Sequence, residues 1–246
     1  MLLPRTKRPP PDWLTKWTYA HRGLHNNDVP ENSLLAARLA IEAGHGIECD
    51  IQRSADDHPM VFHDWEFGRL TNGKGSIASR RAAEIQQLQF VDSDENPATL
   101  LQLLDLIGGQ VPLLVEIKSK PRYDIARSCA IVANALRDYS GDHAVMSFDP
   151  RVARWFRKHS PAMLAGLVMR EDDHGYTQQA WRRYLALWIA RPDFLAYHIH
   201  ALPNPMVAKL RKRGLPILTW TVNSRALRHR AERFADTLIA EGEGIE

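Results

Sequence analysis

Short apolar runs alternate with longer amphipathic segments along the whole chain. The short runs are rich in aliphatic and β-branched residues, as buried strands are, and they lie at residues 17–21, 46–52, 111–117, 143–148, 163–169, 194–199, 215–221 and 235–240. The amphipathic segments predict helices near residues 31–44, 99–108, 122–139, 149–159, 176–190, 204–213 and 223–234. The chain is therefore expected to be an α/β protein.

Eight strands separated by helices predict a parallel sheet with helical crossovers. Closure of such a sheet into a TIM (β/α)₈ barrel is the commonest arrangement of eight units, and 246 residues suit one barrel domain spanning residues 1–246. An open doubly wound sheet is the alternative. It is less favoured because no glycine-rich phosphate-binding sequence follows the first strand. No helical pattern follows residues 235–240, so the eighth helix is not expected.

The interval from Arg53 to about Ala98 interrupts this alternation of strands and helices. It contains "SADDHPMVFHD" and then a polar stretch with several glycines, "GRLTNGKGSIASRRAAEIQQLQF". Loops of this length in compact domains are often functional. In a barrel, the loop of residues 53–98 would lie over the carboxyl ends of the strands, where active sites lie.

Carboxylates interrupt two of the predicted strands. In "GIECDI" the side chains of Glu48 and Asp50 share one face, and in "VEIK" those of Glu116 and Lys118 do. On an edge strand, Glu116 and Lys118 could form a simple surface ion pair. In a barrel the three carboxylates would converge at the mouth, where they would repel one another without a cation. Oxygen ligands, with no Cys or His at zinc spacing, indicate Mg²⁺ or Ca²⁺.

Two histidines follow predicted strands. "AHRG" places His21 and Arg22 at the end of the first strand, and "VFHD" places a second strand-end histidine, His63, after the turn at residues 56–59. A lone histidine is more often structural, but here the Arg22 guanidinium suits a phosphate group. Two imidazoles beside a metal and a phosphate could provide a general acid and a general base near neutral pH.

Composition and charge exclude several classes of protein. The net charge is +3, and the basic residues are dispersed except in short groups such as "RKRG" at residues 211–214, so a nucleic-acid-binding protein is not indicated. No run approaches the ~20 apolar residues of a membrane span, and the N-terminus lacks the apolar core of a signal peptide. Cys49 and Cys129 lie in apolar settings and suit reduced core residues. A cytoplasmic protein is expected.

Six short motifs, in order, carry a family resemblance. "HRG", "PENS", "ECD", "VFHD", "EIK" and "WTVN" resemble the glycerophosphodiester phosphodiesterase family, from about Ala20 to Ala240. The resemblance implies a TIM barrel with a small insertion after the second strand, a divalent metal and two catalytic histidines. It further implies metal ligation by Glu48, Asp50 and Glu116, catalysis by His21 and His63, phosphate binding by Arg22 and Lys118, and a substrate contact by Trp220.

Several positions keep two interpretations. Asn32 could cap the first helix or contact the site, and Trp220 could fill the barrel or line the substrate pocket. His25, His45, His58 and His198 are read as structural, His198 being the clearest potential exception because it lies near a strand end. The family often ends its last strand with Thr-Asp-x-Pro, whereas "LIAEGEG" places Ala240 and Glu241 there. A substrate contact by that loop is therefore in doubt.

The resemblance implies metal-dependent hydrolysis of glycerophosphodiesters to glycerol 3-phosphate and an alcohol. The histidines would act as acid and base, and the substrate's glycerol 2-hydroxyl would form a cyclic phosphate that water then opens. One rival is a lysophospholipase D or a sphingomyelinase-D-like lyase of the same fold. That enzyme would need an apolar groove, for which the insertion offers few apolar residues. A second rival is a non-catalytic phosphate- or metal-binding relative, although none of the expected acids or histidines is missing.

Overall fold

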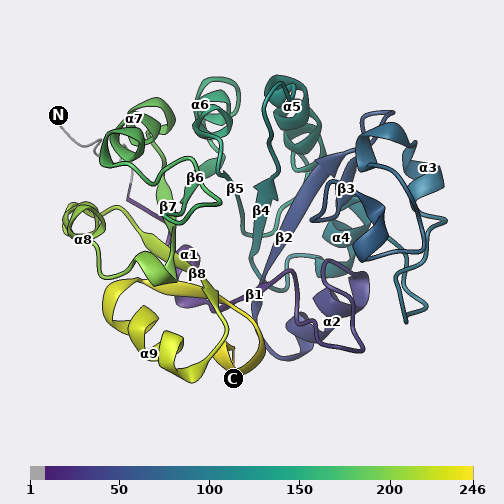
Figure 1. The fold of residues 1–246 in the computed structure, drawn as a ribbon, viewed down its shortest axis with the longest axis horizontal. Helices are drawn as coiled ribbons and strands as arrows, with labels where there is room; N and C mark the ends of the chain where they lie inside the picture. Colours follow the sequence, from purple (N-terminus) through teal and green to yellow (C-terminus); the bar gives the residue numbers. More distant parts are fainter. Residues whose placement is uncertain (1–8, 246) are drawn as a thin grey trace. The chain divides into compact units, whose positions relative to one another are not determined.

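The computed structural model describes residues 9–245, which fall into two compact units (Figure 1). The first unit spans residues 20–143. The second unit comprises residues 144–245 together with residues 9–19. The acids and histidines expected to carry the chemistry all belong to the first unit, whereas Trp220 belongs to the second.

The sheet of the first unit is built around β2 (Gly46–Arg53). This strand pairs parallel with β4 (Leu113–Ile117) and antiparallel with the short β3 (Pro59–Val61). β1 (Tyr19–His21) begins at the boundary of the unit. Outside the insertion, the helices of the unit are α2 (Leu34–Glu42), α4 (Leu100–Ile107) and α5 (Ile125–Ala135). Their first turns are capped by side chains of Ser33, Thr99 and Asp124, each of which accepts a hydrogen bond from a backbone N–H.

The insertion after β2 has its own apolar core. Besides β3 it contains two 3₁₀ turns, η1 (Phe67–Arg69) and η2 (Ile77–Ser79), and the one-turn helix α3 (Ala82–Ile85). This core consists of Met60, Phe62, Phe67, Ile77, Ala82, Ile85 and Phe90. The ring centroids of Phe62 and Phe67 lie 5.8 Å apart in an edge-to-face contact. This packing holds the insertion in one conformation, although its sequence reads as polar.

The second unit is a run of parallel strands with helices between them. β5 (His143–Ser147), β6 (Leu164–Met169), β7 (Phe194–His198), β8 (Ile217–Val222) and β9 (Thr237–Ala240) pair in that order. α6 (Pro150–His159) and α7 (Ala180–Ala190) pack against β6 and against each other, as Figure 1 shows. The remaining helices are α1 (Trp13–Lys16), α8 (Pro205–Arg211) and α9 (Arg225–Phe234), with 3₁₀ turns η3 (Ile199–Ala201) and η4 (Gly242–Gly244).

All the predicted strands and helices are present, so the fold is the expected TIM (β/α)₈ barrel with an insertion after β2. α1 and α3 were not predicted, because four residues are too few to show a helical period. Within the described residues, β9 is followed by η4 and not by an eighth α-helix. Cys49 and Cys129 are buried and do not form a disulfide bond with each other.

In the part of the chain that the structure describes, none of the helices is long and apolar enough to cross a membrane. The single-domain organisation and the cytoplasmic location stay predictions.

Candidate active site

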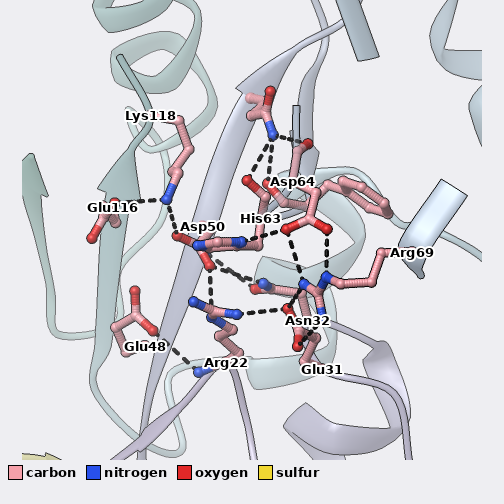
Figure 2. A network of polar contacts seen from close by, with 12 residues as sticks. Arg22, Glu31, Asn32, Glu48, Asp50, His63, Asp64, Arg69, Glu116 and Lys118 are labelled. Carbon is pink, nitrogen blue, oxygen red and sulfur yellow. Dashed lines mark hydrogen bonds and ion pairs between the residues drawn. The ribbon is translucent and has the colours of Figure 1, made fainter. Parts of the chain in front are cut away.

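Three carboxylates meet at one end of the β2–β4 pair. The parallel register places Asp50 beside Glu116, and Glu48 lies two residues earlier on the same face of β2. Glu48 and Asp50 are each 2% exposed and Glu116 is 8% exposed. One oxygen of each lies within 4.8 Å of the others, so a single ion could contact all three. Figure 2 shows them facing a common point.

Burial and mutual repulsion make this group electrostatically unfavourable by itself. Burial, followed by the charges of Asp50 and Glu116, raises the pKa of Glu48 well above its usual range. Burial likewise raises the pKa of Glu116. Burial also opposes ionisation of Asp50, but Lys118 and Arg22 outweigh it and hold the pKa of Asp50 below its usual range. Buried carboxylates that repel one another when ionised are suited to binding a hard divalent cation, which relieves the repulsion.

Two basic side chains border the carboxylates. Lys118 Nζ lies 3.2 Å from Asp50 Oδ1 and 3.2 Å from Glu116 Oε1. Burial lowers the pKa of Lys118, but these two acids raise it above its usual value, so Lys118 is protonated. Arg22 Nε lies 3.2 Å from Asp50 Oδ2, and the Arg22 backbone N–H donates to Glu48 Oε2 over 3.1 Å. Each cation is thus held at the edge of the acidic cluster.

Asn32 belongs to the site and does not cap the helix. Its side-chain NH₂ donates to Asp50 Oδ2 over 3.0 Å, and its Oδ1 accepts the Asp50 backbone N–H over 3.1 Å. The residue has φ +59°, a left-handed conformation that Asn tolerates better than most residues. Ser33 is the N-cap of α2, and its hydroxyl accepts from the Ala36 N–H. The open choice for Asn32 is therefore decided in favour of a site contact.

His63 is held by a chain of ion pairs that the sequence did not predict. Its Nδ1 lies 2.7 Å from Asp64 Oδ1, and Arg69 binds both oxygens of Asp64, with Nε at 2.5 Å from Oδ2. Arg69 also contacts Glu31, over 2.8 Å between NH2 and Oε1, and Glu31 Oε1 accepts from Arg22 over 2.7 Å. Figure 2 shows this continuous chain from His63 to Arg22.

A buried amide fixes the backbone that carries His63. Gln52 Nε2 donates to the carbonyls of His63, over 3.0 Å, and of Phe62 and Asp64. Gln52 shares the face of β2 with Glu48 and Asp50, so the strand alternation that identified those two acids could also have identified it. Asp64 directly follows the predicted histidine, whereas nothing local in the sequence points to Arg69.

His21 ends β1 and, together with His63, contributes to the low pKa of Asp50. The structure therefore brings both histidines within electrostatic reach of Asp50. Burial lowers the pKa of His63 from its usual value, Asp50 opposes this change, and Lys118 and Arg22 reinforce it. His63 is consequently neutral over most of the range near pH 7 and able to accept a proton.

Trp220 lies on β8 in the second unit, among polar and aromatic groups. Its ring centroid is 5.3 Å from that of Phe148 and 4.9 Å from that of His198, and the Arg170 guanidinium lies 5.6 Å from its ring centroid. The indole N–H donates to the Ala196 carbonyl over 3.1 Å. The substrate contact of Trp220 stays a prediction. His198, the histidine singled out as a potential exception, contacts it.

Comparison with known proteins agrees with this arrangement. The model of the glycerophosphoryl diester phosphodiesterase family matches residues 21–239. A glycerophosphodiester phosphodiesterase of Caldanaerobacter subterraneus is 30% identical, and the match covers 84% of this chain and 85% of that protein. Human glycerophosphodiester phosphodiesterase 1 is 27% identical, with 83% of this chain and 71% of that protein covered.

Solved structures show the same fold at lower identity. A phosphodiesterase of Oleispira antarctica, solved with the product sn-glycerol-3-phosphate, aligns with a TM-score of 0.80 at 23% identity, covering 91% of this chain and 92% of that one. A putative glycerophosphoryl diester phosphodiesterase of Silicibacter pomeroyi aligns with a TM-score of 0.78 at 23% identity, covering 96% and 91%. The family model spans the two histidines, the three carboxylates and the two basic residues. The chain therefore belongs to the glycerophosphoryl diester phosphodiesterase family.

Proposed function

We propose that this chain is a phosphoric diester hydrolase that cleaves small glycerophosphodiesters to glycerol 3-phosphate and an alcohol. The observation that carries the proposal is the set of buried carboxylates bordered by Lys118, Arg22 and His63, which lies within the span matched by the family model. Two similar proteins support it: a relative 30% identical is a glycerophosphodiester phosphodiesterase, and a structural neighbour was solved in complex with sn-glycerol-3-phosphate.

The carboxylates of Glu48, Asp50 and Glu116 would hold one divalent cation, Mg²⁺ or Ca²⁺. The fit rests on the donor set, which consists of three buried carboxylates with oxygens within 4.8 Å of one another. Such an ion supplies positive charge that neutralises the phosphoryl oxygens as negative charge builds on them. Asn32 and the Arg22 backbone N–H orient the Asp50 and Glu48 carboxylates, so that the binding geometry is formed before the ion enters.

Arg22 and Lys118 would bind the phosphate of the substrate. In the structure their cationic groups lie 3.2 Å from acidic oxygens, which positions them at the edge of the cluster. A phosphodiester entering there would bring its own anionic oxygens to these cations. The interaction strengthens as charge develops in the transition state, and it therefore favours turnover as well as binding.

His21 and His63 would transfer the protons. One imidazole removes the proton of the glycerol 2-hydroxyl, whose oxygen then attacks phosphorus, while the other protonates the departing alcohol oxygen as the P–O bond breaks. The products of this step are a five-membered cyclic phosphate and the free alcohol. In the second step, water loses a proton to the imidazole that had acted as acid. The ring then opens to glycerol 3-phosphate as the first imidazole returns its proton.

Trp220 would contact the alcohol portion of the substrate. Its neighbours Phe148, His198 and Arg170 give this part of β8 an aromatic surface with one cationic edge. Such a surface accepts a polar head group through stacking and cation–π contacts.

The deciding experiment compares a glycerophosphodiester with its 2-deoxy analogue, using purified protein supplied with Mg²⁺ or Ca²⁺. Both should bind comparably, but only the compound with the 2-hydroxyl should be cleaved, with a transient cyclic phosphate visible by phosphorus NMR. His21→Ala and His63→Ala should each lower kcat by about 10²–10⁴-fold with little change in KM. Hydrolysis of the 2-deoxy analogue without a cyclic species would show direct attack by water.

A substrate panel separates the rival activities. Glycerophosphocholine, glycerophosphoethanolamine and glycerophosphoglycerol are expected to be turned over faster than lysophospholipids. Preference for lysophospholipids would indicate a lysophospholipase D, and a cyclic phosphate as the sole final product would indicate a lyase. A failure to cleave every diester, with metal bound, would leave a binding protein and refute the proposal.

A further inference from the structure

The outer face of α7 carries a row of exposed aromatic and aliphatic side chains. Trp181, Leu185 and Trp188 are 59%, 43% and 54% exposed, and their spacing of four and three residues places them on one face of the helix. Tyr176, just before the helix, is 71% exposed. These four account for most of the large exposed apolar side chains in residues 9–245; the others, Val91 and Leu101, lie elsewhere.

The neighbouring helix α6 supplies positive charge. Neither α6 nor α7 contains an Asp or Glu. α6 contains four basic residues, Arg151, Arg154, Arg157 and Lys158. The Arg157 guanidinium donates to the Ala190 and Ile189 carbonyls, which ties α6 to the C-terminal end of α7, close in sequence to Trp188. Figure 1 shows the two helices side by side. The basic residues of α6 therefore lie on the helix next to the one that carries the aromatic row.

Few carboxylates neutralise this charge. Asp149 pairs with Arg151 over 2.7 Å, Glu171 pairs with Arg183 over 2.6 Å, and Asp172 pairs with Arg170. Burial lowers the pKa of Arg157, and the nearby charges of Arg191 and Arg154 lower it further, whereas the charge of Asp193 opposes this change.

Three exposed cations remain: Arg154, Lys158 and Arg191. Within the described part of the chain, they form no ion pair at salt-bridge distance. We call the group of Arg154, Lys158, Trp181, Leu185, Trp188 and Arg191 the α6–α7 surface.

The chemistry of this surface matches an anionic lipid surface. Helices that lie in a membrane interface combine tryptophan and leucine on one side with arginine or lysine at its border. Tryptophan is favoured at that depth because its ring is apolar and its N–H is polar. A second copy of this chain is a poorer partner. A symmetric contact would bring the same uncompensated cations together, and a stable dimer needs roughly 800 Å² from each partner, more than three side chains supply.

We propose that the α6–α7 surface docks this protein on anionic lipid bilayers. Trp181, Leu185 and Trp188 insert at the level of the headgroups, and Arg154, Lys158 and Arg191 contact the lipid phosphates. This docking requires no chemistry at the carboxylate site, so it is independent of the proposed hydrolysis.

The test is flotation of the full chain with two kinds of vesicle. One kind contains equal parts of phosphatidylcholine and phosphatidylglycerol, and the other contains phosphatidylcholine alone. The protein should float with the anionic vesicles, its tryptophan fluorescence should shift to the blue, and both effects should weaken as salt is added. Equal binding to both kinds of vesicle, or to neither, would overturn the proposal.

Paired variants separate this surface from the general charge of the protein. Arg154→Gln with Lys158→Gln should weaken partitioning about 25-fold, since one basic residue near an anionic bilayer contributes about fivefold. Trp181→Ser with Trp188→Ser should abolish the fluorescence shift. The matched controls are Arg213→Gln with Arg230→Gln, which remove the same charge from exposed positions, and Leu101→Ser, which removes an exposed leucine from α4.

Both controls should bind vesicles as the unmodified protein does, and circular dichroism should confirm that every variant is folded. An equal loss of binding in the charge control would show that net charge alone attracts the protein, and the proposal would fail. It would also fail if sedimentation showed a dimer that the tryptophan variants dissociate, because a second copy would then occupy this surface.

Discussion

The Asp64 carboxylate determines which nitrogen of His63 carries a proton. Burial raises the pKa of Asp64, but its bonds to Arg69 and His63 outweigh this effect and keep it below the usual value. The ionised carboxylate can only accept hydrogen bonds, so His63 Nδ1, at 2.7 Å, must be the donor. In the neutral ring Nε2 is then free to accept a proton, which is the form that a general base requires.

Asp64→Asn should slow turnover and shift its pH dependence. At 2.7 Å, even with the dielectric constant of water, ~80, the lost attraction for a protonated imidazole is about 1.5 kcal/mol, or about one pKa unit. The carboxylate stabilises the charged ring, so its removal lowers the pKa of His63. The pH–rate profile should therefore shift about one unit toward lower pH on the limb that His63 governs. We expect kcat to fall about 10–100-fold, because Asn also breaks the paired contact with Arg69.

The assay is kcat and KM of a soluble diester, measured across pH for Asp64→Asn and for a control. Asp57→Asn suits as the control because Asp57 also binds arginines, Arg53 and Arg127, but does not contact His63. Asn also tolerates the φ of +64° found at Asp57. A normal kcat and an unmoved pH limb in Asp64→Asn would refute the role given to the carboxylate.

Three further changes test the metal site, the phosphate cations and the backbone. Mg²⁺ or Ca²⁺ at a hundred times its Kd should stabilise the protein by about 2.7 kcal/mol and so raise the thermal unfolding midpoint above that measured with chelator. In Glu116→Gln, most of this rise should be lost. Lys118→Met removes a cation 3.2 Å from Asp50 and Glu116, so metal binding measured by calorimetry should become about tenfold tighter, while kcat/KM should fall. If neither the metal affinity nor kcat/KM changed, the position assigned to Lys118 between the metal and the phosphate would be wrong. Gly23→Ala should lower the free energy of unfolding, measured with urea, by about 3 kcal/mol, because Gly23 has φ +78° and a Cβ there would lie 2.8 Å from Ala36. Gly44 has φ +72° but open space around it, so Gly44→Ala should lower it by only about 1 kcal/mol.

The sequence predicted the acids of the site because their signal is local. Alternation along β2 places Glu48 and Asp50 on one face, and any parallel pairing of strand ends brings Glu116 to them. The fold was predictable for the same reason, since each strand and helix carries its own period. Arg69 was not predictable, because its partner Glu31 is 38 residues away and the contact depends on how the insertion packs. That packing relies on phenylalanines dispersed among polar residues, which show no period.

The sequence alone left two interpretations open for Asn32, helix cap or site contact, and experiment can separate them. The side chain makes two buried hydrogen bonds to Asp50, over 3.0 and 3.1 Å, while the backbone holds φ +59°. Asn32→Gly keeps the backbone and removes both bonds, so unfolding should become easier by about 2 kcal/mol. Asn32→Ala adds the cost of a left-handed Cβ, about 1 kcal/mol more.

Both Asn32 variants should weaken metal binding about 10–100-fold, because Asp50 loses the group that orients it. Urea unfolding and metal titration measure the two effects, and Ser33→Ala, which removes the α2 cap, is the control that should lower stability by about 1 kcal/mol without changing metal affinity. If Ser33→Ala weakened metal binding as much as Asn32→Gly, the loss would come from the start of α2, and a direct role for Asn32 at Asp50 would be wrong.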